Sequence, residues 1–106
     1  MTSFKRGDVV LVDLGYAAKV RPCVVIPIPI ADSRRNMSDV APLTTEIRGG
    51  ECEVPFPKPK WLAEESVVHL IGLVGVDNAR IQRRPGPLPA DRLDAIDDGL
   101  LRLFGL

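Results

Sequence analysis

The chain has 106 residues, of which 45% are hydrophobic and 26% charged, and these are ordinary values for one small globular domain. A chain of this length can bury a single core without disulfides or a structural metal ion. Fourteen Lys and Arg residues balance fourteen Asp and Glu residues, so no overall electrostatic field marks the protein as a binder of nucleic acid.

The two cysteines, Cys23 and Cys52, lie far apart in the sequence and form no CxxC motif. We expect buried free thiols rather than a disulfide, because residues 1–6 contain no apolar stretch typical of a secretory signal. No hydrophobic run reaches the length of a membrane span. The sequence therefore predicts a cytoplasmic protein without a membrane-spanning segment.

Hydrophobic runs bounded by Gly, Pro and polar clusters predict a series of short strands. Pro27 and Pro29 remove hydrogen-bond donors from the second run, which places that part on an edge or at a bend. The run at 67–76 is long and apolar, so we expect it at the centre of the sheet. In chain order, the expected elements are strands at 9–14, 22–30, 37–43, 52–56, 67–76 and 80–83, a turn at 48–51, one helical turn at 60–65 and the end of the sheet at 85–87.

The pattern changes in the last part of the chain. Leu93, Ile96, Leu100 and Leu103 recur at spacings of three, four and three, which aligns them on one face of a helix over 89–104. Pro89 suits the first turn of this helix. Many short strands followed by one helix predict a mainly β fold of the α+β class, in which the helix packs on a small antiparallel barrel.

Two polar spots interrupt the strands. Arg21 precedes Pro22 between two hydrophobic runs, and Thr44-Thr45 closes a later run. A guanidinium and a hydroxyl can both bind phosphoryl oxygens, so the two spots could form a site for phosphodiester cleavage if they meet in space.

Four blocks in this order resemble the MazF/PemK family of toxin endoribonucleases of type II toxin–antitoxin systems. The first block is residues 6–14 followed by Arg21-Pro22-Cys23-Val24-Val25-Ile26, and the second is Val40-Ala41-Pro42-Leu43-Thr44-Thr45. The third is Val76-Asp77-Asn78-Ala79-Arg80-Ile81, and the amphipathic helix is the fourth. The sequence departs from the family pattern in its short loop at 15–20 and in the apolar segment at 70–75, where the family carries polar RNA-contacting residues.

The resemblance implies a single domain over residues 1–106 with an SH3-like barrel and a C-terminal helix. It implies a homodimer with single-stranded RNA along a groove at the dimer interface, and an antitoxin whose flexible segment fills that groove. The implied activity is sequence-specific RNA cleavage that needs no metal ion and no cofactor. The family's essential arginine falls on Arg21 and its essential threonine on Thr44, and the candidate RNA-binding residues are Lys19, Thr45, Arg48 and Arg80.

Cleavage without a metal proceeds most easily by attack of the RNA 2′-OH on the adjacent phosphorus, which leaves a 2′,3′-cyclic phosphate and a 5′-OH. Arg21 suits charge stabilisation, and its high pKa makes it a poor general base. Thr44 would donate its hydroxyl to a phosphoryl oxygen. His69 is the only histidine, and we expect it to be a packed strand residue rather than the base.

Each of these features also has a purely structural interpretation. Arg21 suits the start of a strand, Thr44 and Thr45 suit a strand end, and Trp61 suits a cap on the core. Two alternative functions stay open as well. The first is a DNA gyrase poison of the CcdB kind, since that family also ends in an aromatic residue, a glycine and an aliphatic residue, as Phe104-Gly105-Leu106 does here. We expect instead that Phe104 and Leu106 complete the packing of the helix and that Gly105 is its C-terminal cap. The second is a barrel that binds RNA or protein without catalysis.

Overall fold

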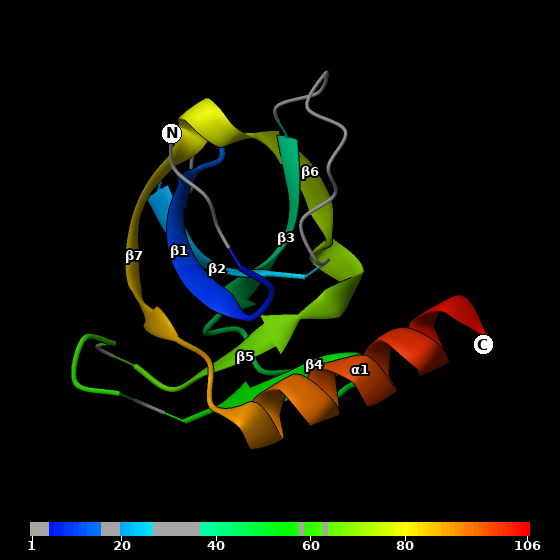
Figure 1. Cartoon of the computed structure of the whole chain (residues 1–106). Coiled ribbons are helices and arrows are strands. Elements are labelled where there is room, and N and C mark those ends of the chain that lie inside the picture. Colours follow the sequence, from blue (N-terminus) through cyan, green and yellow to red (C-terminus); the bar gives the residue numbers. More distant parts are fainter. Residues whose placement is uncertain (1–4, 16–19, 27–36, 58, 63) are drawn as a thin grey trace.

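The computed structural model describes residues 5–15, 20–26, 37–57, 59–62 and 64–106 of the chain (Figure 1). It contains seven strands, two short 3₁₀ helices and one α-helix. These are β1 (Asp8–Asp13), β2 (Val20–Val25), β3 (Met37–Thr44), β4 (Glu53–Phe56), β5 (Ser66–His69), η1 (Leu70–Gly72), β6 (Val74–Asp77), η2 (Asn78–Arg80), β7 (Ile81–Pro87) and α1 (Ala90–Phe104).

All strand pairs are antiparallel, and one strand belongs to two parts of the sheet. In the first part the strand order is β6-β3-β2-β1-β7, and in the second β3 continues into pairing with β5, which pairs with β4. The first part curls until its two edge strands, β6 and β7, are joined through η2 (Figure 1). No hydrogen-bonded pairing joins β6 to β7 within the described residues, so this small barrel stays open. The mainly β fold with a C-terminal helix that the sequence predicted is confirmed.

Two buried clusters occupy opposite faces of the sheet, because neighbouring residues of a strand point to opposite sides. The cluster inside the curl consists of Val10, Val12, Cys23, Val25, Val40 and Val76. The cluster between the sheet and α1 contains Val9, Val24, Ile26, Ala41, Leu43, Val54, Phe56, Val68, Leu70, Leu88 and Ile96.

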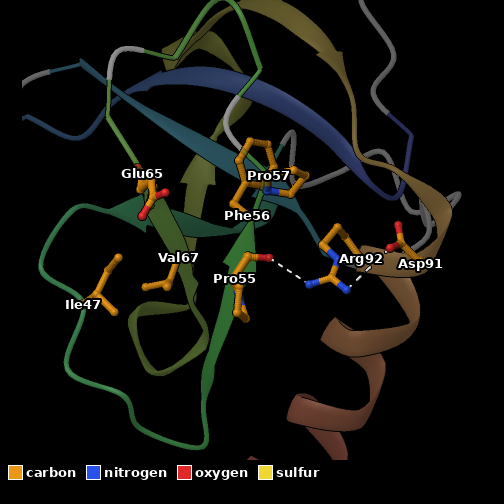
Figure 2. Close-up of a pocket in the computed structure, with 9 residues that line it drawn as sticks. Ile47, Pro55, Phe56, Pro57, Glu65, Val67, Asp91 and Arg92 are labelled. Atoms are coloured by element: carbon orange, nitrogen blue, oxygen red, sulfur yellow. Dashed lines mark hydrogen bonds and ion pairs between the residues drawn. The ribbon is translucent and has the colours of Figure 1, made fainter.

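Helix α1 covers the second cluster with the predicted apolar stripe: Ile96 is fully buried, and Leu93, Leu100 and Leu103 pack beside it. Two side-chain contacts fix the helix. Arg6 forms an ion pair with Asp97, and the Arg92 guanidinium donates to the Pro55 carbonyl oxygen of β4 at 3.1 Å (Figure 2). Among the described residues, no helix is long and apolar enough to cross a membrane.

The expected central strand at 67–76 is wrong. Its residues form β5, the 3₁₀ turn η1 and β6, and the two strands pair with different stretches of β3. Leu70 keeps the parity of Val68, and both are fully buried in the cluster beneath the helix, so the alternation of side chains does not reveal that the chain turns here. A continuous apolar run does not distinguish a long strand from two strands joined by a buried turn.

Other boundaries differ as well. The last strand is longer than the expected 80–83, because β7 runs from Ile81 to Pro87, which pairs with Asp8, and residues 85–87 are part of the strand that ends the sheet. The expected helical turn at 60–65 is a tight turn in which the Leu62 amide donates to the Pro59 carbonyl oxygen. The expected second strand begins earlier, at Val20, and its predicted part at 27–30 lies outside the described residues.

The end of the chain is more exposed than predicted. Gly105 ends the helix in the left-handed conformation (φ 68°) and its amide bonds to the Arg102 carbonyl oxygen, as a C-terminal cap does. However, Phe104 is 59% exposed and Leu106 87% exposed, so the expected packing of these two side chains is wrong. The last turn of α1 extends beyond the sheet (Figure 1).

Candidate active site

Arg21 and Thr44 lie on neighbouring strands, β2 and β3. The printed register between these strands pairs Cys23 with Pro42, and continuing it by two residues aligns Arg21 with Thr44. At this point β3 leaves β2 and pairs with β5, where Thr44 is opposite Val67. On its other side, Arg21 is opposite Val12 of β1. On this extended register the two candidate catalytic residues fall at the same level of the sheet, where its two parts diverge.

Strand alternation also places the two residues on one face. Arg21 has the parity of Cys23 and Val25, and Thr44 has the parity of Val40, all of which belong to the cluster inside the curl. Arg21 and Thr44 are both half-buried at the end of this cluster.

The Cys23 thiol is buried close to the Arg21 charge. Burial raises the pKa of the Cys23 thiol from its ordinary value of 9.0 to about 12, and the nearby Arg21 guanidinium acts in the opposite direction. The Cys23 thiol donates to the Arg21 carbonyl oxygen at 3.6 Å. Both cysteines are free; Cys23 is buried as predicted, whereas Cys52 is only half-buried, so the expected burial of its thiol is wrong. A buried thiol with a raised pKa is a poor nucleophile, so Cys23 supports the site structurally.

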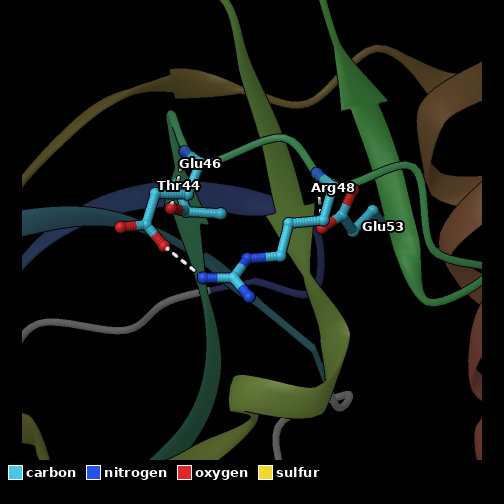
Figure 3. Close-up of polar contacts among 4 residues, drawn as sticks. All are labelled: Thr44, Glu46, Arg48 and Glu53. Carbon is cyan, nitrogen blue, oxygen red and sulfur yellow. Dashed lines mark hydrogen bonds and ion pairs between the residues drawn. The ribbon is translucent and has the colours of Figure 1, made fainter.

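The hydroxyl of Thr44 is oriented by the loop that follows β3. Its Oγ1 accepts a hydrogen bond from the Glu46 amide at 3.1 Å (Figure 3). A hydroxyl has one hydrogen to donate besides its acceptor lone pairs, so this contact leaves the Thr44 hydrogen available.

Arg48 lies in the same loop, which the carboxylate of Glu53 holds in place. Glu53 accepts hydrogen bonds from the Arg48 amide at 3.0 Å and from the Gly49 amide at 2.8 Å. The Arg48 guanidinium extends back to the Glu46 carboxylate at 3.3 Å (Figure 3). Both side chains are more than 70% exposed, with fractions of 79% and 75%, so this ion pair is weak and a phosphate could displace it.

Arg80 lies at the opposite side of the curled sheet from this loop, at the end of β1. Its Nη1 is 3.5 Å from the Asp13 carbonyl oxygen, and a Cβ on Gly15 would come within 2.6 Å of the same nitrogen. Ile81, the next residue, pairs with Val12, which in turn pairs with Arg21. Arg80 is thus two strands away from Arg21 and close to its level.

The remaining candidates differ in what the structure says of them. Thr45 is an exposed bend residue whose carbonyl oxygen accepts from the Ile47 amide. Lys19 lies outside the described residues. His69 lies over Gly72, where a Cβ would meet its Cδ2 at 2.7 Å, which supports its interpretation as a packed residue. The Trp61 ring packs edge-on against the Phe56 ring, with 5.8 Å between the ring centroids, and Trp61 is 41% exposed.

A model of PemK-like, MazF-like toxins of type II toxin–antitoxin systems matches residues 5–104. The chain belongs to this MazF/PemK toxin family. The resemblance seen in the four sequence blocks is thereby confirmed over nearly the whole chain. A comparison with curated protein sequences gives no match.

Solved MazF structures have the same fold. The Mycobacterium tuberculosis toxin MazF-mt6 is 25% identical with a TM-score of 0.82, and the match covers 93% of this chain and 97% of that one. MazF from Deinococcus radiodurans is 21% identical with a TM-score of 0.80, and the match covers 100% of both chains. An endoribonuclease from a mycobacterial species, solved in complex with its cognate antitoxin, is 19% identical with a TM-score of 0.84, covering 98% of this chain and 97% of that one.

A pocket of about 440 Å³ between β4, β5 and the start of α1 was not predicted from the sequence (Figure 2). Its lining residues form no motif, because they come from two connecting segments, two strands and the start of a helix that only the fold brings together. They are Ile47, Pro55, Phe56, Pro57, Glu65, Ser66, Val67, Asp91 and Arg92. The pairing of Thr44 with Val67 is the signal that connects this pocket to the candidate active site.

Proposed function

We propose that this chain is a toxin endoribonuclease that cleaves single-stranded RNA at short sequence motifs and needs no metal ion or cofactor. Arg21 and Thr44 would act on the scissile linkage. The observation that carries the proposal is the common level and common face of these two residues, in a chain that belongs to the MazF/PemK family.

The chemistry requires two kinds of help from the protein. The RNA 2′-oxygen attacks the adjacent phosphorus and loses its proton, the bond from phosphorus to the 5′-oxygen breaks, and that oxygen gains a proton. Arg21 stabilises the charge on the phosphoryl oxygens and can protonate the leaving oxygen. Thr44 donates its hydroxyl hydrogen to a phosphoryl oxygen, which its contact with the Glu46 amide leaves free. No residue is assigned as the general base.

The proposal includes the partners of such a toxin. We propose a cytoplasmic homodimer of single-domain chains, residues 1–106, that binds RNA and is inhibited by a cognate antitoxin. Solved relatives include MazE–MazF from Deinococcus radiodurans and the mycobacterial endoribonuclease with its antitoxin. Exposed apolar side chains, among them Met37, Ile71 and Val74, provide surface that a second subunit can cover.

The exposed C-terminal end of α1 supports a second candidate function. Phe104 and Leu106 are exposed at the end of α1, so the last three residues are free to contact a target protein, as in a gyrase poison of the CcdB kind. The Arg21 and Thr44 spots have no role in that function, which makes the two candidates separable.

The deciding experiment incubates the purified protein with a long single-stranded RNA in excess EDTA and maps the new ends. Endoribonuclease activity predicts cuts at a short motif with cyclic phosphate ends. Loss of one oxyanion-stabilising group elsewhere lowers rates by about a hundredfold or more, and we expect Arg21→Ala to do the same. Lys60→Ala is the control, since Lys60 is exposed in the turn at 59–62. Intact RNA together with gyrase-dependent DNA breaks supports the second candidate, and neither result leaves a binding protein.

A further inference from the structure

We propose that the pocket between β4, β5 and the start of α1 holds the base of a nucleotide that flanks the scissile linkage, with Glu65 accepting hydrogen bonds from that base. This inference rests on the proposed endoribonuclease function and assigns part of its sequence specificity to a set of residues.

The pocket begins one strand away from Thr44. Thr44 is opposite Val67, and Val67 is opposite Pro55. Residues directly opposite each other in antiparallel strands share a face of the sheet, and adjacent strands lie about 4.8 Å apart. The strand that carries Val67 is therefore about 5 Å from that of Thr44, and Pro55 is one strand further. Val67 and Pro55 line the pocket from the face of Thr44, and Phe56, Asp91 and Arg92 line it from the helix side. The pocket therefore opens at the end of β4 and β5 and begins at the strand next to Thr44.

The pocket has apolar walls that suit a planar base. Three of the walls are the apolar side chains of Ile47, Pro55 and Val67, and Figure 2 shows them grouped on one side of the pocket. Ile47 is 51% exposed, so an occupant would cover apolar surface that now contacts water. Bases removed from a stack bind between apolar or aromatic side chains in this manner, and a volume of about 440 Å³ has room for one.

The charged side chains of the pocket favour a base over a phosphate group. Glu65 is exposed and forms no hydrogen bond or ion pair with the other described residues, so its carboxylate is free to accept. The Arg92 guanidinium is already engaged by the Pro55 carbonyl oxygen and, at 3.5 Å, by the Asp91 carboxylate. The pocket thus carries two carboxylates, of Glu65 and Asp91, and one guanidinium, of Arg92, which is already paired. This balance of charge repels a phosphate group. The pocket therefore suits the base rather than the backbone of the RNA.

The edge of the sheet argues against an extended peptide as the occupant. Strand β4 is an edge strand, and a peptide adds to such an edge through backbone hydrogen bonds. Pro55 and Pro57 have no N–H to donate, and the Pro55 carbonyl oxygen is taken by Arg92. This edge is closed to strand addition.

The free carboxylate also indicates which base fits. Guanine presents two adjacent N–H donors on its pairing edge, which match the two oxygens of a carboxylate. Adenine and cytosine present one amino group there, and uracil presents a single N–H between two carbonyl oxygens that repel a carboxylate. We infer a preference for guanine at one position beside the cut, and discrimination against uracil.

The test maps cleavage sites in an RNA library randomised around the cut, for the native protein, Glu65→Gln and Glu64→Gln. Glutamine keeps the shape of glutamate and removes the charge, and Glu64 is an exposed neighbour outside the pocket. We expect guanine enrichment at one flanking position for the native protein and for Glu64→Gln. Glu65→Gln should lower that enrichment about tenfold, since one bidentate base contact commonly provides discrimination of this size, while the ends produced stay the same.

Enrichment within twofold of the native value in Glu65→Gln would overturn the inference, as would a native preference for uracil at every flanking position. A binding assay separates this outcome from failure of the proposed function. In it, fluorescent RNA hexamers with guanine or uracil at each position, and a fluorescent Lys-rich peptide, are titrated with the native protein and with Glu65→Gln. Binding with a Glu65-dependent guanine preference but no cleavage would contradict the proposed endoribonuclease function and support the base pocket. No binding at all sinks both, and Glu65-dependent binding of a Lys-rich peptide without any base preference assigns the pocket to a protein partner instead.

Discussion

Gly99 of α1 lies directly against Leu70 of η1, so closely that a Cβ on Gly99 would come within 2.5 Å of Leu70 Cδ1. Leu70 is fully buried and part of the cluster beneath the helix. This contact explains why a glycine, which usually weakens a helix interior, stands in the middle of α1. It also fixes the helix to the turn that separates β5 from β6.

We therefore expect Gly99→Ala to destabilise the protein although alanine favours helix formation. The gain in helix propensity is about 1 kcal/mol, and overpacking a buried contact commonly costs about 1–3 kcal/mol, so the free energy of unfolding should fall by about 1 kcal/mol. Urea unfolding measures this change. Gly50→Ala is the control, because no atom lies within 4 Å of its Cβ position, and it should stay within about 0.5 kcal/mol of the native protein. Equal stability of the two variants would contradict the packing account.

Sequence patterns predicted the elements whose periodicity is regular. The stripe from Leu93 to Leu103 predicted α1, and hydrophobic runs bounded by polar clusters predicted the strands that became β1 and β3. The same reasoning missed the turn at Leu70, because its residues are as apolar as a buried strand and the turn exists only through packing on Gly99. It also assigned Phe104 to the core, since the helical stripe does not reveal that the last turn extends past the sheet. That residues 1–106 form a single domain stays a prediction.

A second prediction concerns Gly15, which has a positive φ of 77° and lies against the Arg80 guanidinium. Gly15→Ala would both strain the backbone and force Arg80 from its place beside Asp13. If Arg80 contacts RNA as proposed, KM for RNA should rise several-fold while kcat changes little, because a binding group moves and the reacting groups stay.

Gly105→Ala provides the matched control for this change. Gly105 also has a positive φ, of 68°, but nothing lies within 4 Å of its Cβ position. Both variants should lose about 1 kcal/mol of stability or more from backbone strain, and only Gly15→Ala should raise KM. An unchanged KM in Gly15→Ala would remove Arg80 from the RNA-binding surface.

A third prediction concerns the dependence of stability on pH. The pKa of Cys23 is raised to about 12 in the folded protein, while the unfolded chain has the ordinary value of 9.0. Above pH 9 the unfolded chain releases this proton and the folded protein keeps it, so rising pH stabilises the unfolded state relative to the folded one. The stabilisation is fully present below pH 9 and is lost as the pH rises toward 12, by at most about 1.4 kcal/mol per pH unit.

Urea unfolding at pH 8 and pH 10.5 tests this sign. The stability of the native protein should fall more between the two values than that of Cys23→Ala, which lacks the thiol. Cys52→Ala keeps Cys23 and should follow the native protein. A parallel decline of the native protein and Cys23→Ala would show that the buried thiol does not control this part of the pH dependence.

The candidate site was predicted from the sequence only as separate spots. Arg21 and Thr44 could be selected by residue type, by their places at strand ends and by family resemblance, but their common level depends on the register of β2 against β3. The pocket could not be predicted, because Glu65 is an ordinary exposed glutamate until the pairing of Val67 with Thr44 brings it beside the site. Residue types predict chemistry, and register determines which groups act together.

The account depends most on Arg21 and Thr44 acting at the same phosphodiester linkage. The most direct test is a double-mutant cycle on single-turnover RNA cleavage in EDTA, with the native protein, Arg21→Ala, Thr44→Val and the double variant. We predict that Arg21→Ala lowers the rate about a hundredfold or more, that Thr44→Val lowers it substantially, and that the double variant loses far less than the product of the two, as groups that act as a unit do. Single variants that cleave at the native rate, or a double variant whose loss equals the full product, would contradict it.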